Sequence, residues 1–173
     1  MAEANLITIS DVRTYRQVDE KFNAVRFGSF VTDVQRKNLR NLLGDALYLD
    51  LMNDARTSGK YADLLNGKDY TYNGQTVHFY GLKPALVYWW LAVATREGDL
   101  FLSAVGAFSY SNNPQQNFES AKEKNSVAQN YQETAQGYAN DIIKFLDTFS
   151  TTYPLWQSNS AEVNKSNFLS FRL

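Results

Sequence analysis

Cysteine is absent from the 173-residue chain, and histidine occurs once. Without cysteine there can be no disulfides, no thiolate zinc site and no cysteine nucleophile. A single histidine also excludes a histidine cluster that would hold a metal. Neither sign of charge is in excess, since 17 Lys and Arg face 18 Asp and Glu. This balance argues against a dedicated nucleic-acid-binding protein, which usually shows a clear basic excess.

Long apolar runs are also lacking. The longest, Pro84 to Ala94, is too short to span a bilayer. The first residues, Met1 to Asn5, have neither a basic segment nor a long apolar one, so no signal peptide is predicted. We therefore expect a soluble protein that is made in a cytoplasm and has no membrane partner. Its length fits one domain with a sizeable core.

Sequence signatures of catalysis are missing as well. The chain has no glycine-rich phosphate loop and no nucleophile elbow. Asp50 and Asp54 lie one helical turn apart, as do Glu119 and Glu123. Such pairs can act as general acid and general base in hydrolysis, but on an exposed helix face they are more often solvated charges without a catalytic role. We predict no enzymatic activity, no cofactor and no metal. Four basic residues would support at most weak contact with a nucleic-acid backbone: Arg26, Arg36, Lys37 and Arg40.

The clearest positive signal is Asn73-Gly74, which predicts a two-residue type I′ turn in a hairpin of about residues 69–79. Alternation then places four apolar side chains on the face toward the helices: Tyr70, Tyr72, Val77 and Phe79. Asp69 and His78 fall opposite each other on the other face, together with Thr71 and Thr76. No Ser or Cys is placed to complete a catalytic dyad, so we interpret Asp69 and His78 as a surface cross-strand pair.

Most of the remaining chain has helical periodicity. Leu6 to Ile9 is a short β-like run, followed by Ser10 as the N-cap of a short helix. That short helix covers about Asp11–Tyr15, and further helices are predicted at about Phe22–Leu43, Ala46–Arg56, Tyr61–Leu65, Pro84–Gly98 and Gln115–Thr152. The helix from Pro84 is apolar nearly all round and should be central. The fold class is thus mainly α, a small helical bundle with one β-hairpin, a long C-terminal helix and an extended C-terminal arm.

The last and longest helix carries an apolar stripe from Phe118 to Phe149, interrupted by Asn125. Its aromatic and alanine content favours packing against the central helix over pairing with a partner helix.

Two segments suggest contacts beyond the domain. Asp99–Pro114 is a long connection with apolar side chains, and such connections are often functional. Residues 157–173 form a polar arm with apolar anchors, which either docks on a neighbour or simply frays. We divide the chain into one helical domain, 1–156, and this arm. The candidate interface residues are Phe101, Leu102, Val105, Phe108, Trp156, Phe168, Leu169, Phe171 and Leu173.

Several pieces, taken in order, resemble a known family. They are Leu6 to Arg16, Leu39 with Leu42 to Tyr48, Tyr61 to Gly67, Tyr70 to Gly74, and Gly81 to Leu86. Their order and spacing over about residues 6–96 are similar to head–tail connector proteins of tailed phages. These are also called adaptor or neck-ring proteins, and the likeness is to those of Bacteroidetes and crAss-like phages.

The resemblance implies a structural virion protein at the head–tail interface. Such adaptors form a homo-oligomeric ring, usually twelvefold, below the portal protein. The ring extends the DNA channel without sequence-specific binding and docks the next neck or tail protein. The alternatives are another neck or tail-completion ring protein, which would tend to be β-rich, a small virion-associated hydrolase, and a host-directed helical interaction module.

Overall fold

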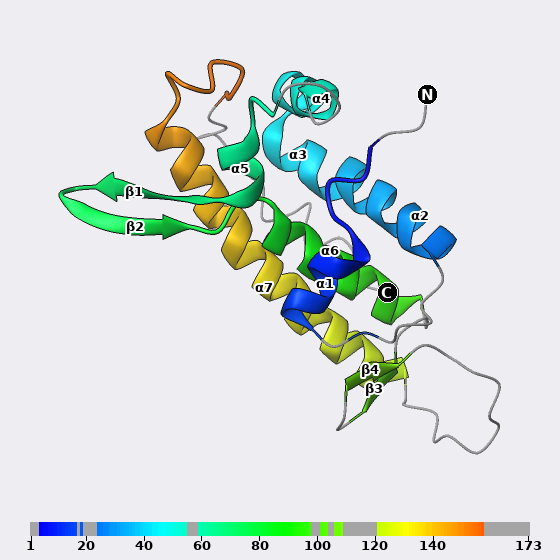
Figure 1. Cartoon of the computed structure of the whole chain (residues 1–173). Coiled ribbons are helices and arrows are strands. Elements are labelled where there is room, and N and C mark those ends of the chain that lie inside the picture. Colours follow the sequence, from blue (N-terminus) through cyan, green and yellow to red (C-terminus); the bar gives the residue numbers. More distant parts are fainter. Residues whose placement is uncertain are drawn as a thin grey trace.

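The computed structural model describes residues 4–16, 18, 24–54, 59–97, 101–103, 106–108 and 121–157. Within them the protein is mainly helical, with a hairpin and a long C-terminal helix, as the sequence predicted. Figure 1 shows helix α6 (Lys83–Arg96) in the middle, with α7 (Ala121–Thr148) along one side and α2 (Ala24–Val34) along the other. One hydrophobic core extends from Leu6 to Trp156. No helix in these ranges is long and apolar enough to cross a membrane.

Helix α6 is the centre of this core. Pro84 lies in its first turn, where the missing N–H costs no helical hydrogen bond. Trp89 and Trp90 are 2% and 0% exposed, and the helix buries side chains on nearly every side. The indole nitrogen of Trp90 donates to the carbonyl of Phe27 on α2 at 3.4 Å. The prediction of a covered central helix is confirmed.

Helix α7 packs along α6 through a stripe of small and large side chains. The buried residues of this stripe are Ala128, Ala135, Ala139, Ile142, Phe145 and Leu146. The stripe therefore serves the chain's own core, as predicted, rather than a partner helix. Asn125 does not interrupt it, because that side chain is exposed. The helix ends at Thr148 instead of Thr152, and its expected beginning near Gln115 lies outside the described residues.

The first segment differs from the expectation. Residues 6–8 are not a strand, although Leu6 and Ile7 are buried. Helix α1 (Ile9–Tyr15) begins earlier than predicted, and its N-cap is Thr8 instead of Ser10. The Thr8 hydroxyl accepts from the Asp11 N–H at 3.2 Å, and Asp11 accepts from the Thr8 N–H at 2.7 Å. This reciprocal capping box fixes the start of the helix.

The predicted helix from Phe22 to Leu43 is composed of three pieces. Helix α2 is followed by a π-helical turn, η1 (Gln35–Leu39), and by α3 (Arg40–Leu43). The expected first residues, Phe22 and Asn23, lie outside the described ranges. Together the three pieces turn five apolar side chains into the core: Phe27, Val31, Val34, Leu39 and Leu42.

After Gly44, helix α4 (Asp45–Asp54) buries Leu47 and Leu51. The helix begins at Asp45, one residue before the expected Ala46, and the expected end at Arg56 lies outside the described part. Helix α5 (Ala62–Asn66) then leads into the strands β1 (Lys68–Tyr72) and β2 (Gln75–Phe79).

The connection after α6 also differs from the expectation. Instead of an irregular connection, residues 101–108 include two short antiparallel strands, β3 (Phe101–Ser103) and β4 (Gly106–Phe108), in which Phe101 pairs with Phe108.

Candidate functional site

The β1–β2 hairpin extends away from the helices at one end of the molecule (Figure 1). Asn73 and Gly74 have φ angles of 50° and 77°, as a type I′ turn requires. The strands pair Tyr72 with Gln75 and Asp69 with His78, which confirms the predicted register. An isolated two-stranded hairpin is marginally stable in water, so contacts with the helices must hold it in place.

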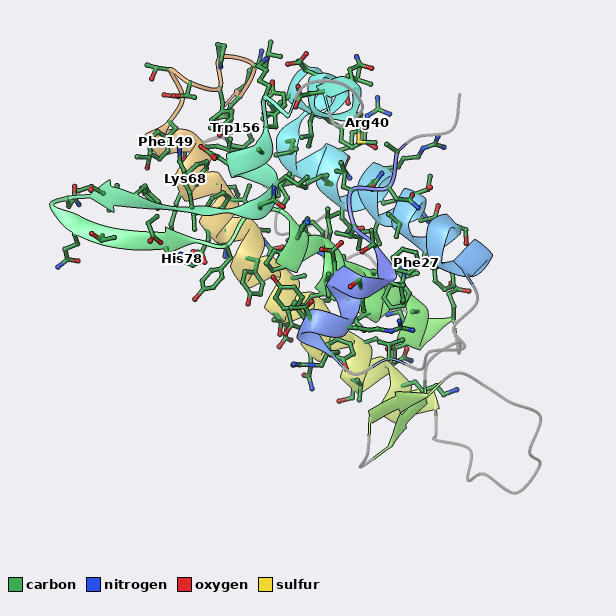
Figure 2. All side chains as sticks on the ribbon, in the orientation of Figure 1. Phe27, Arg40, Lys68, His78, Phe149 and Trp156 are labelled. Carbon is green, nitrogen blue, oxygen red and sulfur yellow. The ribbon has the colours of Figure 1, made fainter. Side chains whose placement is uncertain are left out.

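Aromatic contacts at the base attach the hairpin to α7. Phe79 is 2% exposed, and its ring stacks on Phe145 with 4.0 Å between centroids. Tyr70 meets Phe145 and Phe149 edge-on, each with 5.5 Å between centroids. The ammonium of Lys68 lies 5.1 Å from the centre of the Phe149 ring, and Figure 2 shows these two side chains at the same end of α7. The inward face predicted for Tyr70 and Phe79 is confirmed.

The base of the hairpin is also fixed to α5 by close backbone approach. A Cβ on Gly67 would lie 2.2 Å from the Phe79 carbonyl oxygen. A Cβ on Gly81 would lie 2.5 Å from the Leu65 carbonyl oxygen. Both glycines have positive φ angles, 88° and 82°. The Leu82 N–H donates to the Leu64 carbonyl at 3.0 Å beside them. Only glycine fits at either position, so the direction in which the hairpin leaves the body is determined by its backbone.

Farther out, the hairpin and α7 separate and leave a hollow of about 670 Å³. One wall is the inward face of the hairpin, and the other is the charged last turns of α7. Tyr72 was predicted to lie on the helices, but it is 52% exposed and only lines this hollow. We call this space the hairpin hollow. It is lined by Tyr70, Tyr72, Val77, His78, Phe79, Asp141, Lys144, Asp147 and Thr148.

The outer face of the hairpin carries the only histidine. His78 Nδ1 lies 2.5 Å from Asp69 Oδ1, and their side chains are 57% and 68% exposed. The His78 ring also meets Tyr80 edge-on at 4.5 Å. Salt and solvent weaken so exposed a pair. The arrangement confirms the prediction of a surface cross-strand pair.

From Tyr80 a row of aromatic rings continues between α6 and α7 toward α1. Tyr80 contacts Tyr138, which stacks on Tyr88 with 5.8 Å between centroids. The Arg16 guanidinium lies 5.4 Å from the centre of the Tyr88 ring. Burial raises the pKa of Tyr138 and that of Tyr131 above the ordinary value, so neither phenol becomes ionised near neutral pH. This row ties α1 to the two long helices.

Asp50 and Asp54 were expected to be solvated charge, and for Asp54 that expectation is wrong. Asp54 is 9% exposed and accepts from the Tyr61 N–H at 3.0 Å. Asp50 accepts from the Lys60 ammonium at 2.8 Å and from the Tyr61 hydroxyl at 2.5 Å. The hydrogen bonds from Lys60 and Tyr61 hold the pKa of Asp50 below its usual range. Both carboxylates therefore join α4 to the start of α5. Glu119 and Glu123 fall outside the described side chains.

Among the predicted interface residues, the structure describes the side chain of Trp156 alone. Trp156 is 8% exposed, and its indole nitrogen donates to Asp147 Oδ1 at 2.8 Å. The ring thus packs on its own chain near the hairpin hollow (Figure 2). The side chains of Phe101, Leu102, Val105 and Phe108, and all of residues 158–173, lie outside the described part, so their interface role stays a prediction.

Sequence reasoning missed two residues that hold the N-terminal segment, Thr8 as the cap of α1 and Gln35 through hydrogen bonds to the Leu6 and Ala4 backbone. Thr8 had a signal, because Thr8 and Asp11 have the spacing of a capping box. Gln35 had none, since a glutamine followed by the polar residues Arg36, Lys37 and Asn38 is ordinary on a helix surface. In the parts of the chain that the structure describes, His, Asp and Glu side chains do not gather in threes as a metal site would need.

A family model matches residues 39–165 of the chain, and its description is a family of unknown function (DUF6712). Neither the curated proteins nor the solved structures gave a match.

Proposed function

For this chain, which belongs to the DUF6712 family of unknown function, we propose a structural role as a head–tail connector of a tailed phage. Copies of the protein assemble as a ring below the portal, with the DNA channel through its centre. The ring is made in the host cytoplasm and presents a surface on which the next neck or tail protein docks. Catalysis has no part in this role.

The observation that carries the proposal is the set of residues between about 6 and 96 that resembles connector proteins. The structure supports it in one respect. The resembling pieces Tyr61 to Gly67, Tyr70 to Gly74 and Gly81 to Leu86 meet at the hairpin and its base. They include the two glycines that leave no room for a side chain. These pieces therefore specify one projecting element together with the helix behind it.

A projecting hairpin on a rigid helical body suits a ring subunit. Subunits of a ring meet head to tail, so each needs a projecting surface and a different receiving surface. The β1–β2 hairpin projects, and the hairpin hollow and the exposed helix faces are available to receive. The near-zero net charge of −1 is compatible with a channel that DNA slides through without being held.

A tagged copy of the protein recovered from infected cells tests the proposal. We expect mass spectrometry to identify a portal-like protein and further neck or tail proteins among the bound partners. Electron microscopy of the same eluate should show rings. Recovery of host enzymes alone would contradict the connector role. Release of sugar or peptide from purified cell wall would point instead to a virion-associated hydrolase.

A further inference from the structure

The outer edges of the β1–β2 hairpin are open to another strand. This sheet has two strands only, so each strand has one edge without a partner strand in the described part of the chain. The pairing of Tyr72 with Gln75 beside the turn fixes which backbone groups point outward. They belong to Asp69 and Thr71 on β1, and to Thr76 and His78 on β2. A row of this kind is a template for strand addition.

The inward face of the same hairpin is only partly covered. Phe79 and Tyr70 pack on α7, but Tyr72 is 52% exposed at the hairpin hollow. Val77 is half-buried beside it. A strand added at an edge would continue this face, and its apolar side chains would enter the hollow. The hollow therefore selects a strand with apolar residues at every second position.

The end of the chain has this pattern. Leu169, Phe171 and Leu173 alternate with Ser170 and Arg172. In an extended strand the three apolar side chains share one face, and Ser170 and Arg172 point to the other. On a hairpin, Arg172 would then lie on the outer face that carries the Asp69 carboxylate.

The length of the terminal segment and the place where it leaves the core also allow it to reach a hairpin. The chain is anchored at Trp156, whose indole bonds to Asp147, and Asp147 lines the hairpin hollow. Residues 158–167 link this anchor to the proposed strand at 168–173, and fully extended these ten residues span at most roughly 35 Å. That reach is enough to leave one copy and meet the hairpin of the next in a closely packed ring.

We propose that residues 168–173 of one copy add as a strand to the β1–β2 hairpin of a neighbouring copy. Leu169, Phe171 and Leu173 enter the hairpin hollow, and backbone hydrogen bonds form along the open edge. The donor and the acceptor are different surfaces of the same chain, which is the head-to-tail relation that a closed ring needs. The inference rests on the proposed ring, because it takes the neighbouring copy as the source of the strand.

Cross-linking between full-length chains tests this arrangement, and the absence of natural cysteine makes every thiol an engineered one. One chain carries Thr76→Cys on the outer face of the hairpin, and a size-tagged chain carries Ser170→Cys. A short bis-maleimide linker joins thiols despite small shifts of register. The control acceptor is Asn130→Cys, an exposed position on α7 away from the hairpin. We expect roughly ten-fold more product with Thr76→Cys, because a docked strand raises the effective concentration of its thiol.

Two phenylalanines separate a strand from other modes of binding. In a strand Phe171 faces the hollow and Phe168 faces away, whereas on a helix the two would share a face. Phe171→Ser on the Ser170→Cys chain should reduce cross-linking to the level of the control. Phe168→Ser should leave it nearly unchanged. Equal losses from the two substitutions, or equal yields at Thr76→Cys and Asn130→Cys, would overturn the proposal.

A chain that carries both Thr76→Cys and Ser170→Cys identifies the donor. Exchange between copies gives a ladder of cross-linked oligomers. A looped monomer would mean that each tail covers its own hairpin, and this too would overturn the proposal. Mass photometry of the same samples, with and without the portal protein, distinguishes a failure of the strand exchange from a failure of the connector role. Rings without the specific cross-link refute the strand exchange alone, whereas the absence of any ring refutes the connector role.

Discussion

Gln35 holds the N-terminal segment in place with both ends of one side-chain amide. Its Oε1 accepts from the Leu6 N–H at 2.8 Å, and its Nε2 donates to the Ala4 carbonyl at 3.1 Å. The residue is 0% exposed and begins the π-helical turn η1. Leu6 and Ile7 therefore stay in the core without strand pairing, because a side chain takes over the hydrogen bonds that a neighbouring strand would supply.

We expect Gln35→Met to lower the free energy of unfolding by about 2 kcal/mol. Methionine fills a similar volume but leaves the Leu6 N–H buried without an acceptor. Urea denaturation measures the loss, and hydrogen exchange should show the Leu6 amide losing protection. Lys37→Met, two residues on and 73% exposed, is the matched control and should change stability by less than about 0.5 kcal/mol. Equal effects of the two substitutions would contradict this role for Gln35.

Gly67 gives a second prediction at the residue scale. Gly67→Ala would place a Cβ against the Phe79 carbonyl and force a strained φ, so we expect a loss of at least about 2 kcal/mol. Gly137→Ala is the control, since this glycine lies within α7 and its Cβ would meet nothing within 4 Å. That change should stabilise the protein by roughly 0.5–1 kcal/mol. Thermal unfolding of both variants checks the opposite signs, and a neutral Gly67→Ala would refute the close approach.

At the scale of elements, α1 is joined to α6 by the capping residue Asp11. Its carboxylate accepts from the Thr8 N–H and hydroxyl and lies 3.1 Å from the Lys83 ammonium. Burial by itself would raise the pKa of Asp11, but the Thr8 hydrogen bonds and Lys83 outweigh it and hold the pKa below the ordinary value. A carboxyl group with a lowered folded-state pKa stabilises the fold above its unfolded pKa, near 3.9. That contribution disappears as the pH falls through the folded pKa.

Asp11→Asn should therefore cost about 1 kcal/mol at pH 7. The difference from the parent should shrink below about pH 4, where the parent carboxylate is itself protonated. Denaturant titrations at a series of pH values measure this convergence. Asp33→Asn, at an exposed α2 position, should have a smaller effect at pH 7. If the free energies of unfolding of Asp11→Asn and the parent differ by the same amount down to pH 3, the ionic role of Asp11 is ruled out.

At the scale of the whole molecule, the proposed strand donor, residues 168–173, follows the described core in the chain. Among the described residues, the core extends from Leu6 to Trp156 and already holds all the long helices together. Deleting Gln157 to Leu173 should therefore weaken ring assembly and leave the helical circular-dichroism signal in place. Size-exclusion chromatography with the portal present measures the assembly. Unchanged assembly would remove the arm from the interface, and loss of the helical signal would mean that the deletion acts on folding instead.

Much of the fold followed from local patterns in the sequence. The apolar run after Pro84 can only be buried, so it had to be a central helix. The steps of three and four from Ala128 to Phe145 marked the face of α7 that packs on it. Asn73-Gly74 determined the hairpin and its register, because positive φ at two adjacent residues leaves one favourable turn. These features depend on residues that are close together in the chain.

Only the tertiary structure revealed the features that depend on contacts between residues far apart in the sequence. Leu6 and Ile7 have the composition of a strand, but the Leu6 N–H donates to the Gln35 side chain instead of to a neighbouring strand. No local sequence pattern predicts a hydrogen bond between residues so far apart in the chain. Asp54 looked like surface charge, but in the fold it is 9% exposed and accepts a hydrogen bond from the Tyr61 N–H. The hairpin hollow exists because Gly67 and Gly81 direct the strands away from α7 while Phe79 and Phe145 hold their base. The sequence by itself determined the elements, whereas long-range contacts determined which surfaces they leave open.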